Sequence, residues 1–266
     1  MFGFLKNVIG SHKLILELSK NDFKKKYAGS YLGIVWAFIQ PIVTVLVYWF
    51  VFEKGLRSGQ ELPYPFVLWL IAGLVPWFFF SDAWNGGTSS LMEYQYLVKK
   101  VVFQIDILPV VKELAALYVH AFFVLFTLVL CVCYGFWPDL YMLQILYYTF
   151  CAFMLVTGLS YMTSAVVVFF RDLTQIISIV LQIGMWVTPI MWNMETIADF
   201  PDWLKTLFRF NPMYYIVTGY RDALLDKVWF WERPMWSLYF WGLTIVFLLV
   251  GTRVFRKLRV HFADVL

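Results

Sequence analysis

The residue types that usually carry chemistry are few and scattered in this chain. Its three histidines are far apart, and only His120 falls inside a long apolar stretch. Cys131 and Cys133 would lie about 200° apart around a helix, so they cannot share a metal ion. The sequence has no phosphate-binding loop, zinc-protease helix, nucleophile elbow or dinucleotide motif. We therefore predict no catalytic residue, no metal site and no cofactor held by this chain.

The composition indicates which elements must position any functional residue. Of 266 residues, 62% are hydrophobic and only 14% are charged, whereas soluble domains have about 45–50% apolar and roughly 25% charged residues. Charges are absent from residues 27–52, 62–81, 114–138, 140–170, 173–194 and 234–252. Each stretch could cross a ~30 Å hydrocarbon core as a helix. We predict one all-α membrane domain over 1–266, with transmembrane helices at 34–52, 64–83, 114–137, 141–168, 173–194 and 235–252.

The distribution of Lys and Arg orients these spans. One side carries about twice as many as the other, and the positive-inside bias therefore places both termini in the cytoplasm. Residues 1–30 are then a cytoplasmic amphipathic segment and 85–112 a cytoplasmic loop. Residues 195–233 lie outside and should form two short helices that dip into the membrane and return, with the second one starting at Asn211 and Pro212. The net charge of +4 does not suggest nucleic-acid binding.

Two cytoplasmic patterns could contact other molecules. Lys24, Lys25 and Lys26 form a basic cluster at the membrane edge, which suits either anionic lipid in general or a phosphate-bearing substrate. Apolar residues repeat at helical intervals between Leu91 and Val98 and precede two lysines. A short amphipathic helix there could dock onto another protein or pack on the membrane surface.

The interior of the predicted spans has many aromatic residues and almost no ionisable ones. Aromatic residues make up 21% of the chain, and many fall mid-span, away from the usual interfacial belts. Their faces could line a path for sugars, although packing and lipid contact explain most of them equally well. Proton-driven carriers keep ionisable groups at membrane depth. Because only His120 meets that description, a partner protein is the simplest source of energy.

Several motifs occur in an order that resembles one family. They are 21–41 (a basic segment, Tyr, Leu-Gly, Trp and Pro), 73–81, 87–91, 97–101, 107–109, 170–173, 188–190 and 211–214. Together they resemble the membrane (permease) subunits of ABC-type exporters for O-antigen, capsular polysaccharide and teichoic acid. Gln104 departs from the pattern, because a proline is expected after Phe103.

The resemblance implies a homodimer that pairs with two copies of a cytoplasmic ABC ATPase, which would hold ATP and Mg²⁺. The pair would move a glycan on a lipid pyrophosphate across the bacterial inner membrane, through a channel between the two copies. Candidate path residues are Lys24, Lys25, Lys26, Tyr27, Trp36, Tyr48, Trp49, Tyr161 and Trp186. Candidate ATPase-coupling residues are Leu91, Tyr94, Leu97, Lys99, Lys100 and Asp106, and the external re-entrant motif contains Asn211, Pro212, Arg221 and Asp222.

Three other interpretations remain open at this point. An exporter of a drug or a small lipid would share the topology and would differ in whether its loss causes glycan precursors to accumulate. A glycolipid-modifying enzyme should cluster acidic or histidine residues at a membrane edge, but Asp82, Asp106 and Asp172 are scattered in sequence. A structural scaffold is disfavoured by the ordered motifs.

Overall fold

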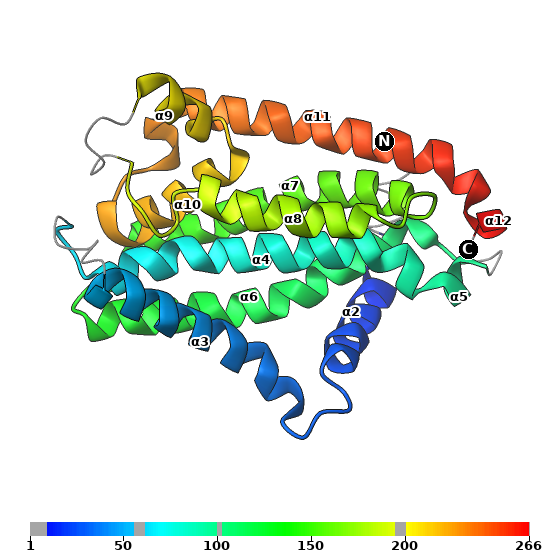
Figure 1. Cartoon of the computed structure of the whole chain (residues 1–266), viewed down its shortest axis with the longest axis horizontal. Coiled ribbons are helices and arrows are strands. Elements are labelled where there is room, and N and C mark those ends of the chain that lie inside the picture. Colours follow the sequence, from blue (N-terminus) through cyan, green and yellow to red (C-terminus); the bar gives the residue numbers. More distant parts are fainter. Residues whose placement is uncertain (1–9, 56–61, 100–102, 195–200, 266) are drawn as a thin grey trace.

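The computed structural model describes residues 10–55, 62–99, 103–194 and 201–265, and within these ranges the chain is helical without strands. The α-helices are α2 His12–Lys26, α3 Trp36–Trp49, α4 Phe66–Glu93, α5 Gln95–Val98, α6 Leu108–Cys133, α7 Gln144–Val167, α8 Leu173–Val187, α9 Asp202–Arg209, α10 Pro212–Arg221, α11 Pro234–Leu258 and α12 Phe262–Val265. The long helices run side by side along the longest axis of the molecule (Figure 1). The predicted all-α membrane class is confirmed.

Within the described residues, five helical stretches are long and apolar enough to cross a membrane: Gly33–Gly55, Phe66–Glu93, Ile105–Cys133, Leu140–Val167 and Pro234–His261. The sixth predicted span, 173–194, is represented by α8, which has only 15 residues. At 1.5 Å per residue it is about 22 Å long, shorter than a ~30 Å hydrocarbon core. It ends early because the residue before Pro189 is disfavoured in the α conformation, and Thr188 is accordingly extended.

Helix α4 lies at the centre of the bundle and packs against α6, α7, α8 and α10. It is buried on all sides for much of its length, because its first part, residues 66–81, carries no charge and includes small residues. The helix continues to Glu93, so the first third of the segment predicted as the loop 85–112 is helical. The predicted loop starts where polar residues begin, because these mark the membrane edge. A helix can continue past that edge, as α4 does. Hydroxyls in this part bond back to carbonyls of their own helix, as Thr88 does to Trp84.

Helices α7 and α11 are packed backbone to backbone at a pair of glycines. A Cβ on Gly251 would lie 2.2 Å from the carbonyl oxygen of Gly158, and a Cβ on Gly158 would lie 2.8 Å from the backbone nitrogen of Leu248. Such close approach is typical of membrane helices, where small residues allow tight van der Waals packing.

The Gly251→Ala variant is expected to be less stable by about 1–3 kcal/mol, because the added methyl group forces the two helices apart. Gly242→Ala, on the same helix, is the matched control, since a Cβ there meets nothing within 4 Å. Thermal unfolding of the purified protein in detergent should show a lower midpoint for the first variant only. Equal midpoints would contradict the assigned packing.

Helix α3 leaves the bundle at an angle (Figure 1). Only Ala37 and Val45 of this helix are buried, while large apolar side chains such as Leu46 and Val47 are exposed. Helix α8 likewise exposes an apolar face that includes Ile183. In a membrane protein these faces contact lipid or another chain.

Candidate functional site at the junction of α2, α4 and α6

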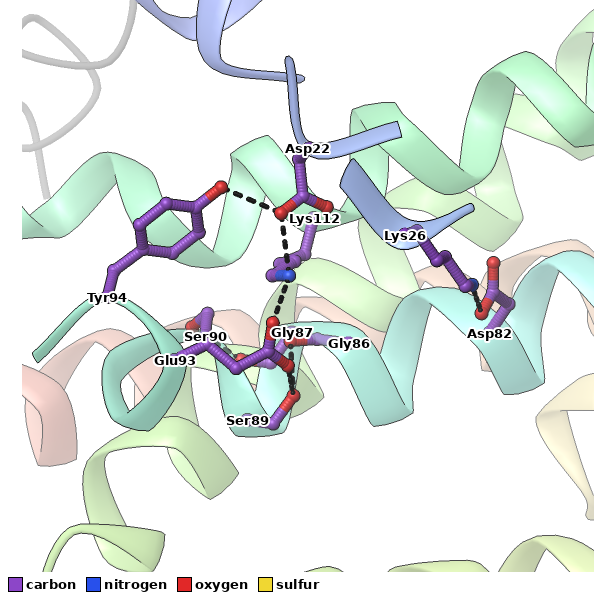
Figure 2. Close-up of polar contacts among 10 residues, drawn as sticks. All are labelled: Asp22, Lys26, Asp82, Gly86, Gly87, Ser89, Ser90, Glu93, Tyr94 and Lys112. Atoms are coloured by element: carbon purple, nitrogen blue, oxygen red, sulfur yellow. Dashed lines mark hydrogen bonds and ion pairs between the residues drawn. The ribbon is translucent and has the colours of Figure 1, made fainter. Parts of the chain in front are cut away.

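Helix α2 is fixed to the bundle by a buried ion pair. Lys112 of α6 places its Nζ 2.7 Å from Oδ1 of Asp22 on α2, and both side chains are about nine-tenths buried. Tyr94, which follows α4, donates its hydroxyl hydrogen to the same carboxylate oxygen at 2.7 Å. Lys112 also pairs with Glu93 at the end of α4, and Ser89 donates to Glu93 (Figure 2). One cation thus holds three helices together.

A second ion pair joins Lys26 to Asp82 of α4 (Figure 2). Both side chains are partly exposed. Burial lowers the pKa of Lys26, but the contacts with Asp82 and weaker ones with Tyr27 and Asp22 outweigh it, so the pKa lies above its ordinary value and the amine stays charged. Lys24 and Lys25 are exposed. Of the predicted basic cluster, one lysine is therefore engaged with a carboxylate of this chain.

A cavity of about 320 Å³ opens between these two ion pairs. Lys26, Tyr27 and Asp82 line it, and the same three residues line a groove of about 480 Å³ between α3 and the bundle. The groove continues past Trp36 and Tyr48. The cavity beside the basic cluster and the groove with the aromatic wall therefore adjoin each other at Lys26, Tyr27 and Asp82.

The predicted path residues fall into two groups. Lys26, Tyr27, Trp36 and Tyr48 line the groove, and Lys25 lines the adjoining cavity. Lys24 is exposed and lines neither. The other three aromatic residues lie elsewhere. Trp49 donates to Glu53, Tyr161 is completely buried and donates to the backbone oxygen of Asp106 at 2.7 Å, and Trp186 is exposed on α8.

The predicted coupling residues are mostly turned inward. Leu91 and Tyr94 are buried, and the carboxylate of Asp106 is bound by Arg259 at 2.9 Å through both oxygens. Lys99 is exposed and Leu97 is partly buried. Lys100 lies outside the described residues. The apolar residues whose helical spacing predicts an outward docking face thus pack mainly into the protein.

Gln104, which replaces the expected proline, accepts a hydrogen bond from Ser11 at 2.5 Å. The coupling segment is therefore attached to the start of α2 and, through Asp106, to Arg259 directly after α11. Tyr96 is exposed beside the buried residues of this segment and was not singled out from the sequence.

The external motif caps and anchors α10. Asn211 accepts a hydrogen bond from the backbone of Met213, and Pro212 occupies the first turn of the helix. Arg221 is buried and donates to the backbone oxygens of Pro189 and Ile190, both at 2.9 Å.

Two further contacts complete this anchor. The guanidinium of Arg221 lies 3.5 Å from the ring centre of Trp69 on α4. Asp222 is bound through both oxygens by Arg233, each at 3.1 Å. These residues hold α10 against α4 and the turn after α8.

The candidate span Ile105–Cys133 contains one buried acidic residue outside the charge-free runs. Glu113 is fully buried near the start of α6 and accepts a hydrogen bond from Thr157 at 2.7 Å. It was missed because α6 begins at Leu108, before the charge-free run starts. His120 forms a hydrogen bond with the hydroxyl of Tyr220 at 2.9 Å.

Within the described residues, no group of His, Cys, Asp and Glu is arranged to hold a metal ion. The features above define a polytopic α-helical membrane protein with a groove along one side of its bundle. Residues 13–225 match the ABC-2 type transporter family, and the chain belongs to that family as a transmembrane subunit. It is 29% identical over 252 residues to the O-antigen export system permease protein RfbA of Myxococcus xanthus, covering 94% of each chain. Two proteins of that name from Klebsiella pneumoniae are 27% and 26% identical, covering 95% of each chain.

Proposed function

We propose that this chain is the membrane subunit of an ATP-driven exporter that moves a lipid-linked polysaccharide out of the cytoplasm. The observation that carries this proposal is the similarity to O-antigen export permeases over about nineteen-twentieths of the chain. The adjoining cavity and groove add a physical reason: Lys25 and Lys26 at the cavity suit a pyrophosphate, and Trp36 and Tyr48 in the groove suit sugar rings.

Two copies of the chain form the channel, each with the groove beside α3 turned toward the other. The exposed apolar faces of α3 and α8 are the surfaces available for this pairing or for lipid. Two copies of a separate ABC ATPase supply the energy and bind ATP and Mg²⁺. The protein lies in the bacterial inner membrane with both termini in the cytoplasm.

At the cytoplasmic end, Lys24 and Lys25 meet the pyrophosphate first because both are exposed. Lys26 joins them when the phosphate oxygens displace Asp82, since a charge-assisted bond to phosphate replaces the one to carboxylate. The coupling segment transmits movement of the ATPase through its attachments to α2 and to Arg259 directly after α11.

Deleting the chain from cells that make the surface glycan tests this function directly. Undecorated surfaces with lipid-linked glycan accumulating inside are the expected result. Normal surface glycan would overturn the proposal. Loss of drug resistance or of a small lipid from the outer leaflet, with glycan unchanged, would favour the other kind of exporter.

A further inference from the structure

A second cavity lies at the end of the bundle where α4 begins. It measures about 430 Å³, within the range of about 300–1,000 Å³ that ligand pockets occupy. Its walls come from α10, the residues that follow it, the first turn of α11 and the turn after α8, the region seen on the left of Figure 1. We call it the outer cavity. It shares no lining residue with the groove beside α3.

Two tryptophans line the outer cavity, and each packs against a neighbouring aromatic ring. Trp236 packs edge-on against Phe210, with ring centres 6.3 Å apart. Trp192 packs edge-on against Phe208 at 5.7 Å, and both tryptophans are only partly buried. Rings held in this way keep their orientation without a ligand, so a sugar ring that stacks on them does not have to order them first.

Paired polar groups lie beside these rings. Asp222 is buried and its carboxylate is held by Arg233 at 3.1 Å. Asp226 is exposed and accepts a hydrogen bond from Tyr64 at 3.2 Å. A carboxylate offers about four acceptor positions, and these contacts use only some of them. Carboxylates next to an arginine thus offer both hydrogen-bond acceptors and donors. Neighbouring hydroxyl groups on a sugar need both, because each hydroxyl can donate and accept a hydrogen bond.

We propose that the outer cavity binds a sugar unit of the exported glycan after it has crossed the membrane. This inference rests on the proposed export function and on the orientation that places α9 and α10 outside. Each copy of the chain holds one such site, apart from the channel between the copies. Occupation of the site holds the emerging glycan and opposes its return toward the cytoplasm.

The test measures binding to the exporter, with its ATPase, in lipid nanodiscs. The probe is a set of short oligosaccharides released by mild acid from the surface glycan of the cells that make this protein, so that no lipid is attached. Trp236→Ala should weaken binding about five- to tenfold, through loss of a stacking surface. Asp226→Asn should weaken it in the same direction and, as an exposed isosteric change, should leave the fold intact.

Trp137→Ala is the matched control, because Trp137 is an aromatic residue at the same end of the bundle, 72% exposed and outside the cavity. It should bind the oligosaccharides as tightly as the unaltered protein. Equal binding by all variants, or no binding by the unaltered protein, would overturn the inference.

A cell assay separates this inference from the proposed function. If deleting the chain leaves the surface glycan unchanged, the export function itself fails. If deletion abolishes the surface glycan but the Trp236 and Asp226 variants bind oligosaccharides normally, export stands and only the outer cavity is reassigned.

Discussion

Replacing Lys24, Lys25 and Lys26 together with Gln is expected to reduce glycan export at least about tenfold, because each charge-assisted bond to a phosphate is worth about 1.5–3 kcal/mol and tenfold corresponds to 1.4 kcal/mol. The variant should insert normally, since the change lies at the exposed end of α2. Surface glycan per cell, at matched amounts of membrane protein, is the measurement.

Two comparisons make this result specific. Lys13→Gln with Lys20→Gln removes two exposed charges from the same helix but away from the cavity, and should export nearly normally. Lys26→Gln alone leaves Asp82 without its cation, whereas Lys26→Gln with Asp82→Asn removes both charges of the pair. If the double variant regains full export, the lysine acts only as the partner of Asp82. Unchanged export in the triple variant would remove the phosphate-binding role altogether.

The second large effect is expected at Lys112. Lys112→Met leaves Asp22 and Glu93 facing each other without a cation in a largely buried place. Breaking a buried ion pair costs about 3–5 kcal/mol, and the lower end applies here because the Glu93 side chain is 51% exposed. Helix α2 should then loosen from the bundle, so we expect lower thermal stability and ATP hydrolysis that no longer produces export.

The controls for Lys112 separate charge from geometry. Lys54→Met removes another lysine that pairs with a glutamate, but at an exposed site, and should change little. The triple change Lys112→Met, Asp22→Asn and Glu93→Gln removes the uncompensated charges and should recover part of the stability. Normal stability and coupled export in Lys112→Met would show that α2 is held by its other contacts with α6.

The positions of the long helices could be predicted because charge is excluded from lipid wherever helices cross it. The start of α10 could also be predicted, since Asn before Pro is a local signal that acts within two residues. Helix ends were less predictable. The charge-free runs 62–81 and 173–194 predicted neither the extension of α4 to Glu93 nor the early end of α8.

The contacts that build the candidate site could not be read from the sequence. Lys26 and Asp82 are 56 positions apart, and Arg221 and Trp69 are 152 apart, so only the tertiary packing brings them together. Spacing also does not say which face of an amphipathic helix is covered. Leu91 and Tyr94, which lie on either side of the end of α4, are both buried, so most of the predicted docking surface is covered.

Helix α3 contributes a wall of the groove while burying little of its own surface. Substitutions on this helix therefore disturb few contacts of the core, whereas substitutions on α4 disturb many. Related exporters can consequently change the width and chemistry of the wall without losing a stable bundle. The variation that adapts such proteins to different glycans should accumulate in α3, and a comparison of sequence drift between α3 and α4 across close relatives would reveal it.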